Sequence, residues 1–179
     1  MKKILIISTS LRNRSNSEIV AQYVKNGAIA AGNDVELITL KNKNIAFCNG
    51  CMACQKLGKC IINDDANIIT DKICESDVIV WVTPIYYYEM SGQMKTLIDR
   101  ANSLYVRNRK FKSVYLVSVS AEDSKNVIDG ALKGVQGWVD CFNEVELKGY
   151  LSFGGFNEPN EINNNNDKLM EAFEFGRRL

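Results

Sequence analysis

The chain contains no histidine among its 179 residues. This absence excludes hydrolases that use histidine as the catalytic base, and it excludes metal sites with histidine ligands. Chemistry in this protein must therefore come from cysteine, carboxylate, lysine or tyrosine side chains, or from a bound cofactor.

The sequence also lacks long apolar runs and an excess of one charge. No apolar run approaches the roughly 20 residues that a membrane-spanning helix needs, and 22 basic residues nearly balance 21 acidic ones. We therefore expect neither a membrane span nor a nucleic-acid-binding surface. The apolar run at the N-terminus ends at Ile7, which is too short for a secretory signal. These features predict a cytoplasmic protein, in which thiols stay reduced.

Short apolar segments alternate with amphipathic ones along the chain. Strands are predicted at 3–8, 34–40, 77–83, 111–120 and 144–151, with Pro84 ending the third. Helices are predicted at 18–31, 64–75, 92–105, 123–140 and 167–178, with a polar linker at 163–166. This alternation predicts an α/β fold of the flavodoxin-like type, a doubly wound five-stranded parallel sheet of order 2-1-3-4-5 with helices on both faces. We expect a single domain over residues 1–179, with 41–63 as a cysteine-bearing loop insertion.

The loop that follows the first strand, residues 8–17, contains hydroxyls, an amide and two guanidinium groups before a helix begins. Ligands of such sheets bind at the carboxyl ends of the strands, and helix N-termini attract anions. Arg12 can add charge-assisted hydrogen bonds. Neither a G-x-G-x-x-G nor a Walker pattern is present, so the loop suits one terminal phosphate. An ordinary capped helix accounts for the serines and asparagines equally well.

Three consecutive tyrosines, residues 86–88, follow Pro84 after the third strand. They cannot all face a core, so at least one is expected to line a cleft, where it offers a platform for a planar ring. A dimer contact is the alternative, because tyrosine is also common at interfaces.

Taken together, TSLRNRSNS after the first strand and TPIYYYEMSGQMKTLIDR after the third resemble the NADPH-dependent FMN reductase family, from Lys3 to about Ser120. The resemblance implies a flavodoxin-like fold, bound FMN and a homodimer. It implies a phosphate site in the first loop, a ring site in the second and a far ring edge after the fourth strand. The implied residues are Ser10, Arg12, Ser15, Asn16 and Ser17 for the phosphate, Pro84, Ile85, Tyr86 and Tyr87 for the ring, and Ser118, Ser120 and Glu122 for the far edge. Thr9 stands where relatives usually carry glycine. Lys95, Asp99 and Arg100 match the family's helix and are expected to serve the helix surface and inter-helix pairing.

Four cysteines lie close together in the order C-x2-C-x2-C-x5-C: Cys48, Cys51, Cys54 and Cys60. The shared middle cysteine strains a mononuclear zinc site, whereas bacterial ferredoxins use C-x2-C-x2-C for cubane clusters. The spacing resembles the iron-sulfur flavoproteins, in which a [4Fe-4S] cluster relays electrons to FMN. A reduced structural loop is the alternative interpretation. Cys74 and Cys141 are expected to be buried, unreactive thiols.

Three functions follow from these observations. The first is an oxidoreductase in which FMN takes a hydride from NAD(P)H and passes electrons to a small acceptor such as a flavin or a quinone. The second is an electron carrier that exchanges electrons between a [4Fe-4S] cluster, FMN and a ferredoxin-like partner. The third is a non-enzymatic flavin-binding module, because a fold alone does not fix a function.

Overall fold

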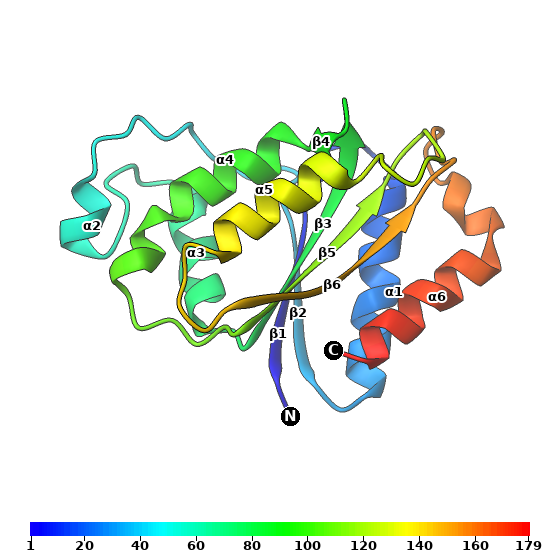
Figure 1. The fold of residues 1–179 in the computed structure, drawn as a ribbon, viewed down its shortest axis with the longest axis horizontal. Coiled ribbons are helices and arrows are strands. Elements are labelled where there is room, and N and C mark those ends of the chain that lie inside the picture. Colours follow the sequence, from blue (N-terminus) through cyan, green and yellow to red (C-terminus); the bar gives the residue numbers. More distant parts are fainter.

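The structure, a computed structural model that describes all 179 residues, is built on a six-stranded sheet (Figure 1). Five strands are parallel, in the order β2-β1-β3-β5-β6, and β4 pairs antiparallel with the end of β3. The strands are β1 (Lys3–Ser8), β2 (Asp34–Thr39), β3 (Val78–Tyr86), β4 (Glu89–Met90), β5 (Ser113–Val119) and β6 (Glu146–Phe153). The parallel order confirms the flavodoxin-like topology predicted from the sequence.

Helices cover both faces of the sheet. They are α1 (Asn16–Ala30), α2 (Ala53–Leu57), α3 (Asp65–Glu75), α4 (Gly92–Arg100), α5 (Asp129–Val139) and α6 (Asn166–Arg177), with 3-10 turns η1 (Ala101–Val106) and η2 (Glu161–Asn164). The pair α1 and α6 lies on one face, and α3, α4 and α5 lie on the other (Figure 1). None of these helices has the length and apolar character required to cross a bilayer.

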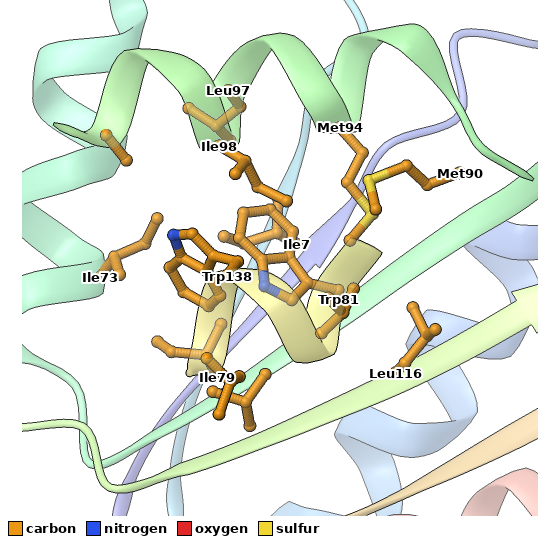
Figure 2. Close-up of a cluster of buried hydrophobic side chains, with 14 of the residues drawn as sticks. Ile7, Ile73, Ile79, Trp81, Met90, Met94, Leu97, Ile98, Leu116 and Trp138 are labelled. Carbon is orange, nitrogen blue, oxygen red and sulfur yellow. The ribbon is translucent and has the colours of Figure 1, made fainter. Parts of the chain in front are cut away.

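The central strands are buried on both faces, which is why they read as continuous apolar runs. Side chains on one face of the sheet pack under α3, α4 and α5, where Trp81 meets Trp138 edge to face with ring centres 5.7 Å apart (Figure 2). Side chains on the other face pack under α1 and α6. The two cores fix the positions of the strand ends that carry the functional loops.

Helices α1 and α6 cross in very close contact. A Cβ atom at Gly27 would collide with the backbone carbonyl of Phe173, and one at Gly176 would collide with that of Val24. Glycine is therefore required at both positions, because only a residue without a side chain allows the two helix backbones to approach this closely.

Several predicted boundaries were wrong. Strand β3 does not end at Pro84 but continues to Tyr86, because the extended backbone that proline imposes also suits a strand. Helix α5 begins at Asp129 rather than at residue 123. Part of the predicted linker at 163–166 belongs to η2 and α6. Cys74 is buried as expected, but Cys141 is exposed, since it lies beyond the end of α5.

Candidate functional site

A cavity of about 170 Å³ opens where β1, β3 and β5 end. Loops from different parts of the chain meet there, at the edge of the sheet where the strand order reverses. Every predicted phosphate-site residue lines it, and so do most predicted ring-site residues. The lining residues are Ser10, Arg12, Ser15, Asn16, Ser17, Pro84, Ile85, Tyr86, Val119, Ser120, Ala121, Phe156 and Asn157.

The polar end of the cavity is formed by the start of α1. The Ser15 hydroxyl caps the helix by accepting a hydrogen bond from the Glu18 N–H at 3.4 Å. The backbone N–H groups of Asn16 and Ser17 lie in the first helical turn and have no acceptor in the chain. Free N–H groups at the positive end of a helix dipole form a site for an anion.

Asn16 and Arg12 both contact the segment that follows β6. The Asn16 amide donates to the Glu158 carbonyl at 2.8 Å, and its side-chain oxygen accepts from the Ile162 N–H at 3.2 Å. Its side chain therefore holds this segment beside the cavity. The Arg12 guanidinium donates to the Asn157 carbonyl, and its side chain remains 46% exposed. It lies at the cavity mouth, where a bound anion can recruit it.

The other end of the cavity is formed by a tight hairpin that joins β3 to β4. Ile85 pairs with Met90 and Tyr86 pairs with Glu89, so Tyr87 and Tyr88 alone make the turn. Both have left-handed backbones, with φ of 51° and 63°. Two-residue hairpin turns usually place asparagine or glycine there, and each tyrosine costs about 1–2 kcal/mol in this conformation. Backbone strain of this kind clusters at functional sites.

Contacts on two sides hold the strained turn in place. The Tyr88 hydroxyl donates to the Glu122 carboxylate at 2.8 Å, which raises the pKa of Tyr88 because the carboxylate stabilises the phenol proton. Helix α5 approaches from behind, where a Cβ atom on Gly130 would collide with the Tyr88 carbonyl oxygen. The hairpin is therefore seated against α5 and linked to the loop after β5.

Three predicted residues do not line the cavity. Tyr87 is 99% exposed and projects away from the molecule. Ser118 is fully buried, and its hydroxyl bonds that of Ser152 at 2.9 Å between neighbouring strands. Glu122 bonds Tyr88 instead. Ser118 and Glu122 therefore stabilise neighbouring segments from outside the cavity wall, whereas the Tyr87 side chain has no contact with the site.

Phe156 and Asn157 line the cavity although sequence reasoning did not select them. They follow β6, beyond the segment that carries the recognisable motifs. Gly154, which precedes Phe156 in the same loop, is the one sequence feature that could have indicated this. A Cβ atom at Gly154 would come within 2.6 Å of Asp123 in the loop after β5. The two loops pack so closely that glycine is required, and the close packing brings Phe156 to the cavity.

Thr9 fits the first loop without strain. Its side chain is fully buried, and its hydroxyl lies 3.2 Å from the Val82 carbonyl and 2.9 Å from the Ser91 hydroxyl. Ser91 caps α4, so Thr9 ties the first loop to the start of that helix.

A larger, more apolar cavity of about 310 Å³ lies on the other side of the first loop, between Leu11, Phe47 and Thr96. The first residues of α4, Gly92 and Gln93, line it together with Lys43, but four of its eight lining residues are hydrophobic. The smaller cavity is the better candidate for the cofactor, because its polar groups converge at one end.

The cysteine-bearing loop holds its thiols in different environments. Cys48 and Cys51 are exposed, Cys60 is half-buried and Cys54 is buried, and none of them forms a disulfide. The structure gathers no three cysteine or carboxylate side chains into a group that could hold a single metal ion. Free thiols in this spacing nevertheless match the donor chemistry of a cubane cluster, whose iron corners lie apart from one another.

A buried ion pair closes the base of this loop. The Arg100 guanidinium donates to the Ala46 carbonyl at 2.8 Å and the Ile62 carbonyl at 3.1 Å, and it binds both carboxylate oxygens of Asp64. Burial alone raises the pKa of Asp64, but hydrogen bonds from Arg100 and from the Ala46 and Ala66 N–H groups outweigh it and lower the pKa. The pair fixes both ends of the loop to α4.

Comparison with known proteins gives a consistent result. Residues 2–143 match the model of the NADPH-dependent FMN reductase family. The chain is 35% identical over 104 residues to an iron-sulfur flavoprotein of Methanocaldococcus jannaschii, a match that covers 58% of this chain and 54% of the relative. The chain thus spans about half the length of that relative.

Two further matches extend over nearly the whole chain. One is a Bacillus subtilis protein provisionally named an NAD(P)H-dependent FMN-containing oxidoreductase, 27% identical over 98% of this chain and 97% of the relative. The other is the structure of an NAD(P)H:quinone oxidoreductase from Methanothermobacter marburgensis, with a TM-score of 0.75 and 16% identity over 99% of this chain and 95% of that one. At that identity the structural match supports the fold alone.

Proposed function

Because the chain belongs to the NADPH-dependent FMN reductase family, we propose that the cavity at the start of α1 binds FMN and that the protein passes electrons from NAD(P)H to a small acceptor. Family membership identifies the chain as an FMN-dependent oxidoreductase and does not support the non-enzymatic alternative. The observation that carries the rest is the polarity of the cavity. Its anion-binding end and its hairpin end are lined by the residues that the two sequence motifs supply.

The phosphate end works through charge and free donors. The N–H groups of Asn16 and Ser17 would bind the phosphate oxygens, and the hydroxyl of Ser10 lies on the same wall. Arg12 would add a charge-assisted hydrogen bond when its guanidinium turns from Asn157 toward the anion. These groups orient the cofactor without taking part in the chemistry.

The ring end works through rigidity. Pro84, Ile85 and Tyr86 line the cavity on a backbone that β4 and α5 hold in place, so they offer a fixed wall and fixed backbone groups to a planar ring. FMN, when bound, supplies the capacity to accept a hydride and release electrons. The chain's part is to hold the ring, exclude water from one of its faces and leave the other open to the donor and the acceptor.

The test is anaerobic purification followed by an absorption spectrum and rapid mixing with NADPH and with NADH. Flavin bands that bleach on mixing and return when a quinone or free flavin is added would support the proposal. Protein that stays colourless after FMN is supplied would overturn it. Flavin bands that neither nucleotide bleaches would remove NAD(P)H as the donor.

A second candidate function is favoured by the cysteines. Their C-x2-C-x2-C-x5-C spacing, the absence of a disulfide among them and the relatives named iron-sulfur flavoprotein support an electron carrier with a [4Fe-4S] cluster on Cys48, Cys51, Cys54 and Cys60. A ferredoxin-like protein would be its partner. Iron and acid-labile sulfide analysis of the anaerobic protein tests this, since about four irons per chain are expected for a cubane cluster. Protein free of iron, with full flavin content, would leave only the first function.

We also propose that residues 1–179 act as one domain in the cytoplasm and assemble as a homodimer. Tyr87, in the turn of the β3–β4 hairpin, and Phe47, in the cysteine-bearing loop, are both exposed aromatic side chains that a second copy of the chain would cover. Light scattering coupled to gel filtration measures the assembly, and a monomeric mass at micromolar concentration would contradict it.

A further inference from the structure

A third cavity, of about 280 Å³, lies between the end of α2, helix α3 and the 3-10 turn η1. Only one of its eight lining residues is hydrophobic, in contrast to the apolar cavity beside the first loop. It shares no residue with the candidate FMN cavity, and α2 and α3 lie toward one end of the molecule, away from the β3–β4 hairpin (Figure 1). Its polar lining residues with side chains are Lys59, Asn67, Thr70, Asp71, Ser103 and Arg107.

Two of these residues are buried and carry hydroxyl groups. Thr70 is 3% exposed, and its hydroxyl oxygen is buried without a hydrogen-bond partner. Ser103, from η1, is 2% exposed and lines the same cavity. An unpaired buried hydroxyl destabilises a fold, and native proteins retain few of them. Its presence beside a polar cavity indicates that a bound group accepts its proton.

The charged side chains give the cavity a net positive charge. Lys59 is exposed and forms no ion pair within the chain. The Arg107 guanidinium donates from Nη1 to the Asp71 carboxylate at 2.6 Å, which leaves other N–H groups of the guanidinium free to donate. The Asp71 side chain is 56% exposed, so water screens its charge. Two cations against one screened carboxylate favour an anion.

The wall that carries Lys59 is fixed to α3. The Asn67 side-chain amide donates to the Cys60 carbonyl at 3.1 Å and to the Ile62 carbonyl at 3.0 Å. These two bonds hold the chain just after Lys59 against the helix that carries Thr70. The cavity is therefore formed by contacts within the protein, and a ligand does not have to assemble it.

We propose that this cavity is a second anion-binding site, which takes a free phosphate ion or the phosphate group of a small phosphomonoester. Lys59 and Arg107 supply the positive charge, and the Thr70 and Ser103 hydroxyls donate hydrogen bonds. A phosphate group has acceptor oxygens in several directions, which suits donors that come from three separate elements. The bound anion joins the cysteine-bearing loop to η1 and so restricts the movement of that loop. The inference depends neither on FMN binding nor on a cluster.

The experiment titrates the full chain, with the flavin that it retains on purification, with inorganic phosphate and separately with glycerol 3-phosphate. Isothermal titration calorimetry measures the affinity, and amide hydrogen exchange followed by mass spectrometry locates the bound anion. The test variants are Lys59→Met and Thr70→Val. Lys56→Met is the matched control, because Lys56 is exposed at the end of α2 but does not line the cavity.

We expect one anion per chain and slower exchange in residues 57–62 and 101–107. Lys59→Met and Thr70→Val should each weaken binding by about tenfold, the loss expected for one hydrogen bond to a charged group. Lys56→Met should bind as the unmodified chain does. Valine keeps the shape of threonine, so Thr70→Val should unfold in urea no more easily than the unmodified chain when no anion is present. Tighter binding of glycerol 3-phosphate would identify a phosphomonoester as the ligand, and tighter binding of inorganic phosphate would identify the free ion.

An unmodified chain that binds neither compound at millimolar concentration would overturn the inference. Equal losses for Lys56→Met and Lys59→Met would overturn it too, because they would show unspecific attraction to surface charge. Slower exchange confined to residues 10–17 would place the anion in the candidate FMN cavity instead. Lys59→Met changes an exposed side chain, so the test stands even if Thr70→Val does not fold. The absorption spectrum described above decides flavin binding separately.

Discussion

Gly130 lies so close to Tyr88 that a Cβ atom on the glycine would collide with the tyrosine's carbonyl oxygen. Tyr88 is one of the two residues of the β3–β4 turn, and its backbone is left-handed. The first turn of α5 therefore forms the back wall of the hairpin that carries the candidate ring site. A helix far along the chain determines how this turn is held.

Replacing Gly130 with alanine is expected to destabilise the protein by about 1–3 kcal/mol, because a backbone carbonyl cannot move aside without displacing the hairpin. Gly137→Ala is the control on the same helix, since a Cβ atom there meets nothing within 4 Å. That substitution should stabilise the protein by about 0.4–1 kcal/mol through the lower entropy of its unfolded chain. Urea unfolding of both variants measures the difference, and equal effects would refute this account of the hairpin.

Removing Asp64 is expected to cost about 3–5 kcal/mol in unfolding free energy, because Asp64→Ala leaves the Arg100 charge buried without a partner. The side chains of this pair are only 0% and 3% exposed. Asp99→Ala breaks an exposed pair with Lys95 and should cost less than about 1 kcal/mol. Chemical denaturation measures both, and a small loss for Asp64→Ala would show that the pair contributes little.

The same carboxyl should make stability depend on pH on the acid side. The pKa of Asp64 is lower in the folded chain than its ordinary value of 3.8. Its contribution is therefore fully present above pH 3.8 and is lost as the pH falls through the lower folded value. The stability difference between the unmodified chain and Asp64→Asn, measured from about pH 6 downward, should shrink only in that acid range. A difference that shrinks already near neutral pH would contradict this assignment.

Arg12→Ala should weaken FMN binding by about tenfold to a hundredfold, the loss expected for one charge-assisted hydrogen bond of about 1.5–3 kcal/mol. Riboflavin, which lacks the phosphate, should bind both proteins equally. Flavin fluorescence titration measures the two ligands side by side. An equal loss for riboflavin would place Arg12 outside the phosphate site.

The parts of the fold that the sequence predicts well are those decided locally. Central strands such as β1 can be identified in the sequence as apolar runs, and helices can be identified as amphipathic segments with capping residues. The β3–β4 hairpin was not predicted because its turn residues are tyrosines, which rarely adopt left-handed backbones. Helix α2 is too short to show a period in the sequence.

The residues of the candidate site also fall into those that the sequence identifies and those that only the structure identifies. The first loop and Pro84–Tyr86 could be identified because their motifs are contiguous, whereas Phe156 and Asn157 reach the cavity only through tertiary packing. Arg100 was expected to serve inter-helix pairing, and it does pair with Asp64 at the start of α3. Its bonds to both ends of the cysteine-bearing loop could not be predicted, because they depend on residues 46 and 62 meeting in space.

The closure of that loop by a guanidinium has a consequence for its durability. A disulfide would constrain the same chain segment, but it would be cut by any reductant strong enough to keep the neighbouring cysteines in the thiol form. The hydrogen bonds around Arg100 contain no group that a reductant or an oxidant would convert. The loop can therefore keep its backbone conformation through repeated cycles of oxidation and reduction, even when the oxidation state of its cysteines changes.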